Sequence, residues 1–268
     1  MVQRPDVFST PFFRQHPPGR KHEITDHTGA PRVYTFPTLF THSPTAMLLF
    51  TADLARVRAH VAPSGLEPVR VAPDRCLVAI ASYSYGAISD GMKPYNELAL
   101  GIPVSTSRVP LVPALLRSAW RSFGVFVLDL PVDSAENCRR GVEIWGLPKT
   151  MKTFNYEDVG DQRMIELRDG NALCMRVTFA RGGRPRTVAE TNQIYSMKNG
   201  RLLSTRVFIH GAAWEYTPLS PLAARCSVEF GTHGLYSAFA GFDLSSRPVL
   251  VREFAAASTA LYLPEDAR

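Results

Sequence analysis

The chain has 268 residues, of which 45% are hydrophobic and 20% are charged. This composition excludes a disordered chain and is typical of one large globular domain or two small ones. The formal charge is +6, and only five of the 30 basic residues are lysines, so the other 25 are arginines. The arginines are scattered without a basic run. This pattern argues against nucleic acid as a partner and is compatible with small anionic substrates.

The N-terminal residues 1–31 are rich in proline, histidine and charge without periodicity, which predicts an extended arm. Residues 32–268 contain no repeat and no low-complexity linker, so we expect a single domain there. Residues 1–13 lack the pattern of a secretion signal, the apolar runs are too short to span a membrane, and no Cys-x-x-Cys pair occurs. We therefore expect a cytoplasmic protein with reduced cysteines and no membrane contact.

Five segments in the first half of the chain predict strands because they combine alternation with β-branched and aromatic residues. They are Arg32–Phe40, Ala46–Phe50, Cys76–Tyr85, Tyr95–Val104 and Phe123–Leu130.

The second half carries turn signals. Asp169-Gly170 and Asn199-Gly200 favour the positive φ angles of two-residue hairpins, and Gly182-Gly183 adds a turn between them. Residues 163–210 are therefore predicted to form an antiparallel meander.

Three segments predict short helices. Ala52–Val61 has an apolar face, and Ser134–Ile144 follows Asp133 as a capping residue and ends before Gly146. Arg252–Leu263 is predicted to be a last helix. The balance predicts a mainly β fold with a few short helices (α+β), built as a barrel or sandwich of antiparallel strands.

Common chemical motifs are absent from the sequence. It contains no glycine-rich nucleotide loop, no Gly-x-Ser-x-Gly elbow and no metal-binding histidine spacing. We therefore expect neither a metal nor an organic cofactor.

Lys149 stands out among the few lysines. It follows a helix stop at Gly146, and Pro148 restricts the backbone directly before it. Trp145 and Leu147 supply apolar bulk nearby. Burial favours the neutral amine, which is the form that attacks a carbonyl group. Lys149 is therefore a candidate Schiff-base nucleophile, and the alternative is a surface lysine whose stem covers a tryptophan.

A carboxylate in an otherwise apolar strand marks a second candidate. Tyr95 and Glu97 point to the same face of the predicted strand, where Ala99 and Gly101 leave room beside them. Glu97 is either a functional carboxylate or an edge-strand glutamate that faces water.

Together the two segments resemble the acetoacetate decarboxylase family, which carries Gly-Arg-Glu-…-Pro-Lys-Lys and Tyr-x-Glu-…-Ile-Pro-Val. Here the first runs from Gly141 to Thr150 and the second from Tyr95 to Val104, each without gaps, within a fainter likeness over residues 31–150. The resemblance implies an antiparallel β cone or barrel in a homo-oligomer, a small keto acid as substrate, and no metal or organic cofactor. It gives Lys149 the nucleophile's role and Glu97 a proton-handling role.

Three departures from the family pattern concern the site. Thr150 replaces the second lysine, and no arginine occurs in the early strand, where His42 is the nearest ionisable residue. A second site glutamate has no counterpart, and hydroxyl groups stand in its neighbourhood. Arg32 is an alternative source of the missing guanidinium if the arm folds over the site. The candidate substrate-binding residues are Tyr83, Tyr85, Tyr95, Trp145 and His42, although packing explains the aromatic residues equally well.

The resemblance therefore predicts a Schiff-base-forming lyase, with decarboxylation of a β-keto acid as the first reaction. The alternative is aldolase–dehydratase or cyclase chemistry on an α-keto acid through the same Schiff base. A further alternative from a different class is a non-catalytic binding or scaffold protein.

Overall fold

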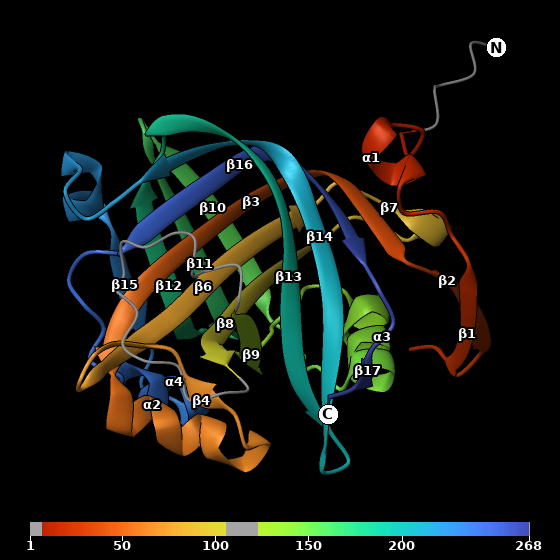
Figure 1. Ribbon diagram of the computed structural model, residues 1–268, viewed down its shortest axis with the longest axis horizontal. Coiled ribbons are helices and arrows are strands. Elements are labelled where there is room, and N and C mark those ends of the chain that lie inside the picture. Colours follow the sequence, from red (N-terminus) through yellow and green to blue (C-terminus); the bar gives the residue numbers. More distant parts are fainter. Residues whose placement is uncertain (1–6, 106–122, 268) are drawn as a thin grey trace.

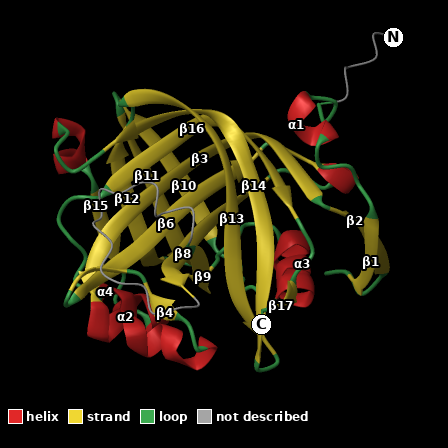
Figure 2. Cartoon of the chain, in the orientation of Figure 1, coloured by secondary structure: helices red, strands yellow, loops and turns green. Residues whose placement is uncertain are grey.

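Seven strands close into a β-barrel in the computed structural model, which describes residues 7–105 and 123–267 (Figure 1; Figure 2). The ring runs β8-β9-β13-β14-β16-β3-β6 and returns to β8. The β9–β13 pair is parallel, whereas the other pairs of the ring are antiparallel. The predicted mainly β fold with a few short helices is confirmed. The barrel strands are β3 (Thr38–Asp53), β6 (Arg75–Tyr85), β8 (Tyr95–Ser105), β9 (Gly124–Asp129), β13 (Arg184–Lys198), β14 (Arg201–Tyr216) and β16 (Leu250–Leu261).

A separate four-stranded antiparallel sheet packs against the barrel through the main hydrophobic core. Ile80 and Leu98 of the barrel share this core with Ile165 and Val177 of the second sheet. The predicted meander over residues 163–210 is therefore wrong in part. Its two hairpins, β11–β12 and β13–β14, form, but they belong to different sheets, and the Gly182-Gly183 segment carries the chain from one to the other. The second sheet contains β10 (Thr153–Val159), β11 (Gln162–Asp169), β12 (Ala172–Ala180) and β15 (Ser227–Phe230).

Short strands complete the sheets at their margins. Strands β4 and β5 pair with β8 and β6, β7 pairs with β3, and β17 pairs with β14. Their bounds are Glu67–Pro68 for β4, Arg70–Ala72 for β5, Ala87–Ile88 for β7 and Glu265–Asp266 for β17.

In the part of the chain that the structure describes, four α-helices lie outside the sheets. Helices α2 and α4 lie at one end of the barrel and α3 at another side (Figure 1). None of the helices in residues 7–105 and 123–267 has the length and apolarity needed to cross a membrane. The helices are α1 (Pro11–Arg14), α2 (Leu54–Val61), α3 (Ala135–Trp145) and α4 (Gly234–Ala240), with 3-10 turns η1 (Ala62–Ser64), η2 (Ser89–Gly91) and η4 (Pro221–Arg225).

The described part of the N-terminal arm, residues 7–31, packs against the barrel of the same chain. Strand β1 (Arg20–Thr25) pairs with β2 (Pro31–Phe36), and Phe13 of α1 is buried beside Leu39 and Ala260. His16 Nδ1 lies 3.0 Å from the Tyr262 hydroxyl. The division into an arm and one domain stays a prediction, but the arm has regular structure and fixed contacts.

The predicted C-terminal helix Arg252–Leu263 is wrong, because most of this segment forms strand β16 between β14 and β3. Two bulges, at Phe254/Ala257 and Ala257/Thr259, interrupt its period of two. Three consecutive alanines at 255–257 fall in this irregular stretch, and alanine is a strong helix former. The bulges therefore hide the alternation of buried and exposed residues that would have identified this segment as a strand.

Asp129 at the end of β9 is buried and accepts a hydrogen bond of 2.6 Å from the Tyr236 hydroxyl. Burial raises the pKa of Asp129 from 3.8 to about 6. The folded state therefore binds this proton more tightly than the unfolded chain. Ionisation of Asp129 lowers the free energy of unfolding as the pH rises from about 4 to 6, and the loss is constant above that range.

Asp129→Asn keeps an acceptor for Tyr236 and removes the buried charge. The variant should exceed the wild type in free energy of unfolding by about 2–3 kcal/mol at pH 7, and the difference should vanish near pH 4. Urea unfolding of both proteins across this range measures the difference. A gain that does not depend on pH would contradict the assignment.

Candidate active site

The loop after helix α3 brings the Lys149 side chain back onto the helix. Ser134, rather than the predicted Asp133, caps α3 by accepting from the backbone N–H of Asn137, since Asp133 is engaged by Asn96 of β8. Gly146 ends the helix in the left-handed region with a φ of 61°, a conformation that favours glycine. The Lys149 stem then lies on Gly141, where a Cβ atom would stand 2.4 Å from Lys149 Cδ.

Strand β13 holds the C-terminal end of α3. The Ser196 hydroxyl donates to the carbonyl of Trp145 at 2.5 Å, and the Lys198 ammonium donates to the carbonyl of Glu143. The Trp145 indole N–H donates to the carbonyl of Tyr262 at 2.8 Å. The bonds from Ser196 and Lys198 satisfy carbonyls that a helix end leaves without intrahelical partners, and all three bonds fix where the following loop begins.

Lys149 and Glu97 form a buried ion pair. The distance between Lys149 Nζ and Glu97 Oε2 is 2.5 Å, and their side chains are 6% and 8% exposed. Glu97 therefore does not face water. Charge-assisted hydrogen bonds of this length are strong, and removal of one partner leaves an uncompensated buried charge.

Three tyrosines surround this pair because strands β6 and β8 place them on one sheet face. Tyr83 is paired with Glu97 across the two strands, and Tyr85 with Tyr95. The Tyr85 hydroxyl donates to Glu97 Oε1 at 3.4 Å, and the Tyr95 hydroxyl donates to Oε2 at 3.3 Å. Lys149 Nζ lies 5.3 Å from the centroid of the Tyr95 ring.

The tyrosine hydroxyls remain protonated in this environment. Burial, followed by the charge of Glu97, raises the pKa of Tyr83, Tyr85 and Tyr95 well above the usual value. The rings of Tyr83 and Tyr85 are stacked at 5.5 Å with an interplanar angle of 4°. The site therefore presents an amine, a carboxylate and protonated hydroxyls within one apolar enclosure.

The structure does not bring all the predicted residues together. His42 is exposed and has a φ of 51°, at an irregular point of β3. Trp145 is buried near the site, but Phe36 packs against its ring and Tyr262 takes its N–H. Arg32 forms an ion pair with Glu136 at the surface end of α3.

Sequence reasoning missed Arg140, which is 2% exposed and carries the largest fully buried side chain in the described residues. Burial lowers its pKa to about 10, so it stays charged at neutral pH. Helical periodicity contained the signal, because Asn137, Gly141 and Ile144 share the buried face of α3 with Arg140.

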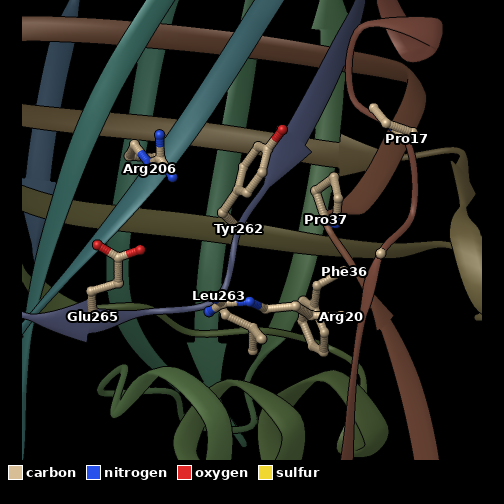
Figure 3. A pocket seen from close by; sticks show the side chains of 9 residues that line it. Pro17, Arg20, Phe36, Pro37, Arg206, Tyr262, Leu263 and Glu265 are labelled. Atoms are coloured by element: carbon tan, nitrogen blue, oxygen red, sulfur yellow. The ribbon is translucent and has the colours of Figure 1, made fainter.

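A cavity of about 240 Å³ lies beside Phe36, which is one of the residues that line it (Figure 3). Arg20, Arg206 and Glu265 line it together with Tyr262 and Phe36. Phe36 therefore lies between this cavity and the residues around Arg140. Its ring packs against Trp145, and the ring centroid is 5.4 Å from the Arg140 guanidinium carbon. Neither Lys149 nor Glu97 lines this cavity.

Comparison with known proteins places the chain in a family. Residues 26–254 match the acetoacetate decarboxylase family, whereas a comparison with curated proteins gives no match. A structure titled as structural studies of acetoacetate decarboxylase is similar with a TM-score of 0.64 and 17% identity over 86% of this chain and 89% of the other.

Two further solved structures share the fold. The acetoacetate decarboxylase of Legionella pneumophila has a TM-score of 0.63 and 16% identity over 89% and 92% of the two chains. The enduracididine biosynthesis enzyme MppR, complexed with pyruvate, has a TM-score of 0.59 and 15% identity over 89% and 93%. Because the family match spans most of the chain, this protein belongs to the acetoacetate decarboxylase family.

Proposed function

We propose that this protein is a lyase that forms a Schiff base between Lys149 and a small keto acid. The observation that carries the proposal is the buried contact of 2.5 Å between Lys149 Nζ and Glu97 Oε2. An amine nucleophile needs a neutral form, and a carboxylate within hydrogen-bond distance provides a base for its proton.

The first chemical step is proton transfer inside the ion pair. Glu97 takes a proton from the Lys149 ammonium, which leaves the amine neutral. The free amine attacks the ketone carbon to give a carbinolamine. A proton from Glu97 or from the Tyr95 hydroxyl then lets the hydroxyl group leave as water, which produces the iminium.

Two reactions can follow from this iminium. In a β-keto acid, the C–C bond to the carboxylate breaks, its electron pair moves to the iminium, and CO₂ leaves. In an α-keto acid, Glu97 removes a proton from C3, and the enamine adds to an aldehyde whose oxygen takes a proton from a tyrosine. The three protonated tyrosines favour this second reaction. The structure of MppR complexed with pyruvate is consistent with it.

Borohydride trapping tests the proposal. The protein is incubated with pyruvate, 2-ketobutyrate or acetoacetate, reduced, and analysed by mass spectrometry. We expect a mass increase equal to the keto acid minus one oxygen atom in the wild type, because the imine loses water and then gains two hydrogens, and no increase in Lys149→Ala. Absence of an adduct with all three acids would contradict the enzymatic proposal and favour a binding or scaffold protein.

A CO₂ assay with acetoacetate separates the two reactions. Release of CO₂ together with adduct formation supports decarboxylation, whereas an adduct without CO₂ supports aldol chemistry. Assembly into a homo-oligomer and a cytoplasmic location stay predictions.

A further inference from the structure

Arg140 is a buried cation with unused donors. One terminal nitrogen, Nη1, lies 3.2 Å from Met92 Sδ, and the other, Nη2, donates to the Thr38 hydroxyl. Its Nε is the one buried side-chain nitrogen or oxygen without a hydrogen-bond partner in residues 7–105 and 123–267. A thioether and a neutral hydroxyl are weak partners for a guanidinium.

The nearest acidic groups do not neutralise Arg140. Glu136 pairs with Arg32 and accepts from the Tyr34 hydroxyl, and Asp90 accepts from the backbone N–H of Thr35. Both carboxylates favour the charged form of Arg140 electrostatically, which raises its pKa, but among the described residues neither forms a hydrogen bond or an ion pair with it. A buried charge without a close counter-ion is destabilising.

Aromatic rings compensate for part of this penalty. The guanidinium carbon lies 4.7 Å from the Tyr34 ring centroid, 5.0 Å from Trp145 and 5.4 Å from Phe36. Such contacts stabilise a desolvated cation. They use no N–H hydrogen bond, however, so the Nε–H keeps no partner and the terminal nitrogens keep only weak ones. In-plane N–H groups are the groups that bind a carboxylate.

Arg140 and Lys149 belong to one site because both lie beside Tyr95. Gly141, the next residue of α3, contacts the Lys149 stem. Tyr95 packs in one buried cluster with the three rings that surround Arg140. Its hydroxyl donates to Glu97, which also binds Lys149.

We propose that Arg140 binds the carboxylate of a 2-keto acid whose C2 carbonyl reacts with Lys149. This inference rests on the proposed Schiff base and identifies its substrate class. In the iminium of a 2-keto acid the carboxylate is bonded to the iminium carbon itself, so the electron pair of that bond would remain on C2 and could not move to the iminium nitrogen. The carboxylate is therefore retained, and the proton removed comes from C3.

A pair of substrates measures this role directly. Pyruvate and methyl pyruvate have the same reactive carbonyl, but only pyruvate carries a charge. The wild type should trap pyruvate with borohydride at much lower concentration than the ester. In Arg140→Gln the pyruvate concentration for half-maximal trapping should rise on the order of 10²-fold, while that for the ester should change little.

Arg139→Gln is the matched control, because it removes one exposed positive charge from the adjacent position of the same helix. It should keep the preference for pyruvate. Arg140→Met, which keeps an unbranched apolar stem, serves as a second variant if Arg140→Gln does not fold, and thermal midpoints are recorded for all variants. A preference for pyruvate that survives in folded Arg140 variants would overturn the inference and leave the Schiff base intact.

Calorimetric binding of pyruvate to Lys149→Met, which forms no imine, separates the two proposals. Binding that persists in Lys149→Met and disappears in Lys149→Met/Arg140→Gln supports the carboxylate site even if trapping fails. Binding that is equal in the two proteins would overturn it.

Discussion

Replacing Glu97 with glutamine should reduce the rate of iminium formation by about 10²–10⁴-fold. Glutamine has nearly the same volume, and its carbonyl oxygen can still accept from one of the two tyrosines, Tyr85 or Tyr95, which now donate to separate carboxylate oxygens. It cannot take the proton of the Lys149 ammonium, so the neutral amine loses its nearest base. Stopped-time borohydride trapping with pyruvate measures the rate, and circular dichroism checks the fold.

The control for this substitution is Glu166→Gln. Glu166 is also buried, and it pairs with Arg168 and Arg176 in the four-stranded sheet. That variant should lose stability through its broken ion pairs but keep the trapping rate. An unchanged rate in folded Glu97→Gln would make Glu97 a structural residue and remove it from the proposed mechanism.

Gly141→Ala should lower the trapping rate by roughly 10²-fold without destabilising the protein. The new Cβ atom would stand 2.4 Å from Lys149 Cδ and 2.6 Å from Cε, so the lysine stem has to move away. A displacement of about 1 Å at a reacting atom is sufficient for this loss. Alanine also has a higher helix propensity than glycine by about 0.5–1 kcal/mol, which offsets any small packing penalty.

Gly146→Ala provides the contrast, because its Cβ atom would meet the Met197 carbonyl oxygen at 2.9 Å and Lys198 Cβ at 2.5 Å. Its φ of 61° also disfavours alanine. This second variant should mainly lose thermal stability. If Gly141→Ala traps pyruvate as fast as the wild type, Lys149 tolerates displacement and the close packing on α3 has no catalytic role.

Local signals in the sequence predicted the elements where glycine and asparagine dictate the backbone. Asn199 and Gly200 both have positive φ and join β13 to β14 as a tight hairpin. Gly146 ends α3 as expected. By contrast, the crossing from β12 to β13 depends on long-range pairing, and no local pattern distinguishes it from a third hairpin.

The site was predictable only in part. The family resemblance singled out Lys149 and Glu97, which are 52 residues apart, and periodicity alone could not have joined them. His42 is the nearest ionisable residue in the strand segment, but an irregular β3 backbone leaves it exposed. Arg140 escaped notice because one arginine among 25 carries no compositional signal, and its burial depends on rings from β2 and α3 that meet only in the folded chain.

The bonds from β13 to the end of α3 have a consequence for the order of folding. Ser196 and Lys198 lie 51 and 55 residues from their partners in α3, and Tyr262 lies 117 residues from Trp145. Contacts across such loops form late, because loop closure entropy must be overcome before they contribute. Helix α3 can therefore form early on its own capping signals, whereas Lys149 reaches its place only after the C-terminal strand has closed the barrel. A nascent chain that ends before residue 262 would contain both members of the ion pair but would lack the Tyr262 carbonyl that accepts from Trp145 at the end of α3.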